Sequence, residues 1–279
     1  MSELSKGMNL GAANVTTEKA EVHIPSNIQA DTLFTFMKQP EYLFAIISKA
    51  SISPRYCSED VTYLHLNGIK RISFPMKCFC DINLHRLSKH LTCYGHYGIA
   101  FSKEWGMKKR IQPVQYINPD SELCIDFSYT FNEALNSSKN DSSEVNHHLR
   151  SFLLHQLMYY KPYSSPFRNR ETDKMEERCF TDECEWRFIP NLQKSDFVPV
   201  YYDDQILNAG IPDMISDAMS RDSSLALSFD YSEVKHIIVK SREDFARLTS
   251  VIAALNLEQA TMFELISKVI VWNEAKGDF

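Results

Sequence analysis

The fold class is decided by the apolar stretch Ile72-Ser73-Phe74-Pro75-Met76-Lys77-Cys78-Phe79-Cys80. This stretch predicts a strand, and its proline, which cannot donate to a sheet ladder, places the strand at an edge, a bulge or a strand start. Asp81 then stands where a helix N-cap is expected, and the apolar stripe of that helix consists of Leu84, Leu87 and Leu91. A glycine-containing turn at 94–98 leads into a short buried strand at 99–101. We therefore expect residues 74–101 to form structural core.

The segments on either side of this core continue with strands and helices. An aromatic-rich strand is predicted at 33–37, and Pro40 opens a helix after it. Further downstream the pattern predicts a helical segment at 103–106, a helix capped by Ser241, and strands at 113–117, 234–239 and 269–271. Together these elements predict an α+β fold with a mixed central sheet and flanking helices.

The alternating residues at 184–189 predict a half-buried strand. On this prediction, the buried face carries Cys184, Trp186 and Phe188. Glu185 and Arg187 form a charge pair on the opposite, polar face.

The composition argues against several classes of protein. Lys and Arg number 30 and Asp and Glu number 36, so the formal charge is −6, and we expect no general nucleic-acid binding. A hydrophobic content of 44% favours a folded chain over a disordered one. One basic cluster is expected to be a solvated helix face, and its members are Lys103, Lys108, Lys109 and Arg110.

The organisation of the chain is expected to be simple. We predict a mobile tail at 1–20 and one α+β domain over 21–279, with polar excursions near 134–148 and 163–182. No secretion signal and no continuous apolar stretch of about 18 residues is found, so we expect a cytoplasmic protein without membrane contact. The seven cysteines are expected to be reduced thiols, because a chain of this size needs no disulfide.

The common catalytic and metal-binding motifs are absent from the sequence. Gly95-x-x-Gly98 lacks the lysine and the preceding strand that a phosphate-binding loop needs. Cys78 and Cys80 lie near Cys93 and three histidines, but their spacing matches no common zinc module, and buried cysteines pack well in cores. We therefore expect no metal.

A nucleotide-sugar pocket is the sharper hypothesis for the remaining polar residues. An aromatic strand, a tyrosine-bearing turn and a glutamate at a strand start supply suitable parts, and a glutamate can stabilise an oxocarbenium-like centre by its charge. The residues concerned are Thr35, Tyr94, Tyr97, Glu183 and Glu185. The competing and more common explanation is that Glu185 and Arg187 are a surface or cross-strand charge pair and that the tyrosines lie at the edge of the core.

Seven segments together resemble, in order, the AbiGi-type abortive-infection antitoxin family of bacteria. They are Ser53–Cys57, Phe74–Ile82, Tyr94–Ile99, Lys103–Gly106, Pro113-Val114-x-Tyr116, Glu185–Arg187 and Asp278-Phe279. The resemblance runs from about Thr32 to the end of the chain. It implies a phage-defence role as the antitoxin half of a two-gene module, whose toxin partner resembles a nucleotidyltransferase. Whether the two proteins touch is left open by the motifs.

A more distant resemblance links the first strand to ADP-ribosyltransferase-like folds, which open with a similar histidine-bearing strand. Thr35 and Met37 replace the histidine and the last threonine of that strand here. Tyr97 and Glu185 match the other pocket positions, so the resemblance implies a degenerate pocket in which Thr35, Tyr94 and Arg187 are further ligand-binding candidates. The leading hypothesis is an antitoxin without a cofactor. The alternative is an ADP-ribosyltransferase-like enzyme that uses NAD, with Tyr97 and Glu185 as catalytic candidates.

Overall fold

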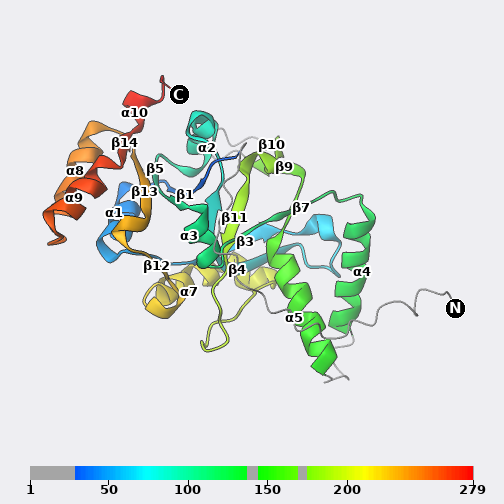
Figure 1. Ribbon diagram of the computed structural model, residues 1–279. Helices are drawn as coiled ribbons and strands as arrows, with labels where there is room; N and C mark the ends of the chain where they lie inside the picture. Colours follow the sequence, from blue (N-terminus) through cyan, green and yellow to red (C-terminus); the bar gives the residue numbers. More distant parts are fainter. Residues whose placement is uncertain (1–28, 137–143, 169–174, 279) are drawn as a thin grey trace, which may run out of the picture.

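A computed structural model describes residues 29–136, 144–168 and 175–278 (Figure 1). The predicted tail at 1–20 and the middle of each polar excursion lie outside these ranges. The described strands build an eight-stranded sheet in the order β14-β13-β5-β1-β4-β11-β6, with β3 also paired to β4. β13 and β14 run parallel, whereas the other pairs of this sheet are antiparallel. The predicted α+β class with a mixed central sheet is therefore confirmed.

The main sheet consists of β1 (Thr32–Met37), β3 (Arg55–Asp60), β4 (Arg71–Cys80), β5 (Tyr97–Ser102), β6 (Gln112–Pro113), β11 (Glu185–Phe188), β13 (Val234–Val239) and β14 (Val269–Val271). The smaller pairs are β2 (Ser51–Ile52) with β12 (Leu227–Ser228), β7 (Gln115–Ile117) with β8 (Tyr160–Pro162), and β9 (Ser164–Arg168) with β10 (Met175–Cys179). The helices are α1 (Pro40–Lys49), α2 (Leu87–Tyr94), α3 (Lys103–Lys108), α4 (Glu122–Asn136), α5 (Glu144–Tyr159), α6 (Asp204–Asn208), α7 (Ile211–Met219), α8 (Arg242–Ala253), α9 (Gln259–Ser267) and α10 (Trp272–Ala275).

One face of the main sheet, called here the first face, packs against α1, α3, α8 and α9. Side chains alternate across a strand, so Leu33 on β1, Ile99 on β5 and Ile237 on β13 share this face. They join the helices in the largest hydrophobic cluster, in which all three are fully buried. In Figure 1 the three helices α1, α8 and α9 lie together beside β13 and β14.

The opposite face, called here the second face, carries two separate helical layers. Phe34 and Cys80 pack against Leu87 and Leu91 of α2. Farther along β4, Phe74 belongs to a cluster with residues of α4 and α5, the two long helices that stand side by side in Figure 1. The predicted stripe is confirmed for Leu87 and Leu91, which are fully buried, whereas Leu84 lies in a 3-10 turn before α2 and is only partly buried. None of the helices within the described ranges has the length and hydropathy that a membrane span requires.

Three local predictions at the ends of β4 and β7 were wrong. Asp81 does not cap a helix but forms a buried ion pair with Lys103, at 2.6 Å between Oδ2 and Nζ. The single strand predicted at 113–117 is divided into β6 and β7, which pair with β11 and β8 respectively. β4 is a central strand rather than an edge strand, and Pro75 fits there because the ladder with β11 ends opposite Lys77 and the next bridge, to Tyr201, forms at Ser73, so that neither needs an N–H from Pro75.

The glycine turn before β5 is required by the backbone. Gly95 ends α2 with φ +109°, a conformation that other residues rarely adopt, and a Cβ built on it would lie 2.2 Å from the carbonyl oxygen of Met37. The turn therefore brings α2 against the end of β1, where the sheet also begins to open.

Candidate functional site

Strand β11 directs its two charged residues into the protein interior, which corrects the prediction of a polar, solvent-facing side. Glu185 is 6% exposed and Arg187 is completely buried. The register pairs Glu185 with Cys80 and Arg187 with Cys78, which places both side chains on the second face of the sheet. Trp186 lies on the first face, where it packs against the main cluster. The alternation holds within β11, but the predicted burial is reversed, since Trp186 and Phe188 are only partly buried. Cys184 precedes the strand and packs with the cluster of Phe34 and Cys80 instead of with Trp186.

Glu185 is held by two cations. Its Oε1 accepts a hydrogen bond of 2.7 Å from Nε of Arg187, and its Oε2 accepts one of 2.5 Å from Nζ of Lys161. The guanidinium of Arg187 also reaches Glu59 at 3.2 Å and donates to the carbonyl oxygen of Met158 at 2.7 Å. Both carboxylate oxygens of Glu185 are therefore engaged by cations.

Glu183 extends this arrangement towards α2. Its Oε2 lies 2.6 Å from Nζ of Lys161, and its Oε1 lies 3.0 Å from Nη2 of Arg178. The hydroxyl of Tyr94, at the end of α2, donates to the same Oε1 at 2.6 Å. We call the six charged residues of this arrangement the ion-pair network; they are Glu59, Lys161, Arg178, Glu183, Glu185 and Arg187.

Each charged group of the network faces a partner of opposite charge. Burial alone would raise the pKa of Glu185, but the charges of Arg187 and Lys161 outweigh burial and hold the pKa well below its ordinary value. For Lys161, burial is likewise outweighed, here by Glu185, Glu59 and Glu183, so its pKa lies well above the ordinary value. The network thus sets three carboxylates against three cations, and the pKa shifts of Glu185 and Lys161 both favour the charged forms of these two groups.

A cavity of about 420 Å³ adjoins the network on the second face. Its wall combines Glu183, Glu185 and Lys161 with aromatic side chains, among them Phe36 and Tyr94. His90 also lines it, and burial together with the charge of Arg178 lowers the pKa of this histidine to about 4. At neutral pH the cavity therefore presents a neutral imidazole, and the carboxylates of Glu183 and Glu185 in its wall are already bound to cations.

Tyr97 and Thr35 are not part of this arrangement. In the register of β1 and β5, Tyr97 pairs with Met37 and Thr35 with Ile99, which places both side chains on the first face. The Tyr97 hydroxyl donates to Oδ2 of Asp244 at 3.2 Å, and burial and Asp244 raise its pKa to about 12. The structure brings Tyr94, Glu183, Glu185 and Arg187 together, and it separates Tyr97 and Thr35 from them by the sheet.

Three residues of the network were not predicted from the sequence, namely Lys161, Glu59 and Arg178. Lys161 is 8% exposed and stands in β8, the short strand that follows α5 without a loop. A lysine between Tyr160 and Pro162 carries no local sign of burial, because its partners Glu183 and Glu185 come from strands and turns more than 20 residues away. A buried cation of this kind is defined by tertiary packing alone.

Cys78 and Cys80, which the sequence analysis considered as metal ligands, lie in the core. Burial raises the pKa values of Cys78 and Cys80, and no group of three metal-ligating side chains occurs among the residues that the structure describes.

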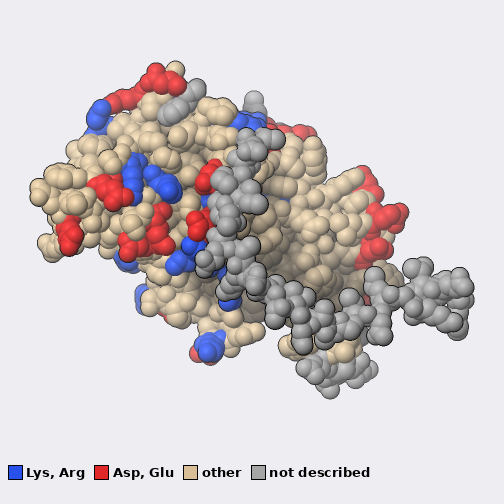
Figure 2. All heavy atoms as spheres, viewed as in Figure 1, with Lys and Arg blue, Asp and Glu red and all other residues tan. Residues whose placement is uncertain are grey.

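The prediction that the basic cluster is a solvated helix face is wrong for Lys103, which is buried against Asp81. Lys108 is exposed and pairs with Glu104 at 2.7 Å. On the face in Figure 2, basic and acidic residues are interspersed over the region of α1, α8 and α9.

Comparisons with known proteins agree on one family. The family described as abortive phage resistance protein AbiGi, antitoxin, matches residues 50–240. The chain is also 31% identical over 249 residues to the "Abortive phage resistance protein AbiGi" of Lactococcus lactis subsp. cremoris, an alignment that covers 81% of this chain and 98% of the relative. No solved structure matches the chain. The chain therefore belongs to the AbiGi family of abortive phage resistance antitoxins.

Proposed function

We propose that this protein is the antitoxin of a two-component abortive-infection module, in which it acts in the cytoplasm on a toxin that resembles a nucleotidyltransferase. Membership of the AbiGi family supports this role. The observation that carries the proposal against the enzymatic alternative is the engagement of Glu185: both of its carboxylate oxygens bind buried cations. A glutamate that must stabilise a developing positive charge on a substrate needs a free, correctly directed oxygen.

The position of Tyr97 also argues against an ADP-ribosyltransferase-like mechanism. Its side chain faces α8 through Asp244, whereas Glu185 faces the α4–α5 side of the sheet. Thr35, which stands in place of a histidine, is 2% exposed on the same face as Tyr97. A single ligand cannot touch these residues together without crossing the sheet. We therefore propose that the protein neutralises its toxin without consuming NAD.

The test is a growth assay in cells that carry the neighbouring toxin gene under an inducible promoter. Expression of the full chain should restore growth after induction, and the purified chain should leave NAD unconsumed. A matched control is Leu87→Asp, which places a charge at a fully buried position of α2 and should abolish rescue by unfolding the protein. Continued growth arrest with well-expressed wild-type protein would refute the proposal. Affinity purification of the tagged chain with the toxin then shows whether neutralisation involves direct contact.

A further inference from the structure

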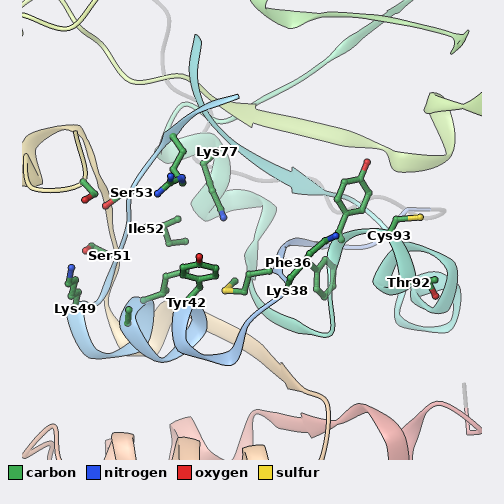
Figure 3. Close-up of a pocket in the computed structure, with 16 residues that line it drawn as sticks. Phe36, Lys38, Tyr42, Lys49, Ser51, Ile52, Ser53, Lys77, Thr92 and Cys93 are labelled. Atoms are coloured by element: carbon green, nitrogen blue, oxygen red, sulfur yellow. The ribbon is translucent and has the colours of Figure 1, made fainter. Parts of the chain in front are cut away.

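The central sheet opens between β1 and β4. These two strands pair through a single register position, Phe34 with Cys80, and β4 continues in pairing with β3 while β1 continues along β5. A cavity of about 640 Å³ lies at this opening, between the end of β1, helix α1, β2 and the end of α2 (Figure 3). Its volume is in the range of pockets that hold small organic ligands, which run from about 300 to 1,000 Å³.

The charge of this cavity is of one sign. Four of its lining residues are cations, namely Lys38, Lys49, Arg55 and Lys77, and none of the described lining residues is Asp or Glu. The chain as a whole carries a formal charge of −6, so such a concentration of positive charge does not follow from composition. Arg55 forms one exposed ion pair, at 3.1 Å to Asp217 outside the cavity wall. The cavity therefore attracts anions.

Lys77 is the strongest indication of an anion-binding site. It projects from the middle of β4 into the cavity and is only partly exposed, and its ammonium group makes no hydrogen bond or ion pair within the described parts of the chain. Burial lowers the pKa of Lys77 below its ordinary value. A cation that is desolvated without a partner destabilises the fold, so its presence is explained if a bound anion completes the site.

The uncharged part of the cavity wall can pack against a flat aromatic ring. Tyr42 of α1 is 61% exposed, and Figure 3 shows it beside the space into which Lys77 points. Phe36 and Tyr94 contribute further aromatic surface, and Ile46 and Ile52 contribute apolar surface. An exposed aromatic residue next to cations is a common platform for stacking a nucleobase.

We propose that this cavity binds a nucleoside diphosphate, with its phosphates at Lys77, Lys49 and Arg55 and its base against Tyr42. This inference goes beyond the proposed antitoxin role and does not depend on it. The site differs from the cavity beside the ion-pair network, whose wall is acidic as well as basic. The proposed site lies where β1 and β4 diverge, and the space between these two strands can hold a ligand.

The first experiment measures ligand binding to the full chain by isothermal titration calorimetry. ADP, GDP, CDP and UDP are the nucleotide probes, with adenosine and inorganic pyrophosphate as the fragments that carry the ring or the phosphates alone. At least one diphosphate should bind more tightly than both fragments. Absence of binding by all four diphosphates would overturn the proposal. Pyrophosphate binding as tight as that of the best nucleotide would also overturn it, because the ring would then contribute nothing.

The second experiment tests the position of the site with Lys77→Met. Loss of a charge-assisted contact to phosphate should weaken nucleotide binding at least about tenfold. The melting temperature of the variant should not fall, since methionine removes an unpaired, desolvated charge and keeps the length of the side chain. The matched control is Lys235→Met, the same change at an exposed lysine of β13 outside the cavity. Unchanged binding in Lys77→Met, or an equal loss in the control, would contradict the assignment.

Discussion

Tyr97 and Glu185 lie on opposite faces of the central sheet. Tyr97 shares the first face with Thr35 and donates to Asp244 of α8, whereas Glu185 shares the second face with Cys80 and binds Lys161 and Arg187. The two residues that the transferase hypothesis placed in one pocket are thus separated by the layer of strands. Because Glu185 binds two buried cations and lies apart from Tyr97, we infer that its role is to stabilise the fold.

Glu185→Gln should destabilise the protein by about 3–5 kcal/mol, the usual cost of removing one partner from a buried ion pair. The substitution keeps the size of the side chain but leaves the three cations of the network with only two carboxylates, Glu59 and Glu183, so that the interior carries one uncompensated positive charge. Urea denaturation followed by circular dichroism measures the free energy of unfolding. A loss below about 1 kcal/mol, which is typical of surface changes, would show that the network contributes little to the fold.

The matched control for this variant restores the charge balance. In Glu185→Gln combined with Lys161→Met, one carboxylate and one cation are removed together, while Arg187 keeps Glu59 and Glu183 keeps Arg178. Residues in one network couple by about 0.5–3 kcal/mol, so the double variant should be more stable than the sum of the two single changes implies. Strict additivity would contradict direct coupling between Glu185 and Lys161.

The sequence predicts the elements of this fold better than the surroundings of its charged residues. β1, α1, the stripe of α2 and β13 follow local periodicity and turn residues, which act within a few positions along the chain. The alternation in β11 was also visible in the sequence. The groups that bury Glu185 and Arg187, however, come from Met158 of α5 and Lys161 of β8, which reach β11 only through tertiary packing. Burial of a charge pair therefore could not be distinguished from exposure in sequence alone.

The stripe of α2 provides the second prediction. Leu87→Ala should cost about 2–5 kcal/mol, because it opens a space in the cluster with Phe34 and Cys80. The matched control is Lys89→Ala, an exposed position in the same helix, which should stay within about 0.5 kcal/mol of wild type. Equal, small effects in the two variants of the helix would mean that the stripe faces an open groove.

The third prediction concerns pH. Burial holds the pKa of His90 at about 4, below its ordinary value of 6.5, so between these values the unfolded chain binds a proton that the folded chain does not. Stability should therefore fall as pH drops from about 6.5 to 4, by up to about 3 kcal/mol from this residue. His90→Phe keeps a ring against Phe36 and Tyr94 and should flatten this dependence. The same slope in wild type and variant would exclude His90 as its source.

The fourth prediction concerns the order in which the cysteine thiols react with an alkylating reagent. Burial raises the pKa of Cys57 to about 11 and also raises the pKa values of Cys78 and Cys80, whereas a hydrogen bond with Thr181 lowers that of Cys179. Since the thiolate is the reactive form, iodoacetamide at pH 8 should label Cys179 well before the other three. Peptide mass spectrometry after timed quenching gives the order. Early labelling of Cys78 or Cys80 in the native protein would show that this part of the core opens readily.

The most direct test of the central claim, that toxin neutralisation involves no chemistry at Glu185, is the growth assay with the double variant Glu185→Gln, Lys161→Met. Circular dichroism first establishes that the variant is folded at the growth temperature, so that loss of the fold is not mistaken for loss of function. We expect the folded double variant to restore growth to toxin-expressing cells as well as the wild-type chain does. A folded double variant that fails to restore growth would contradict it.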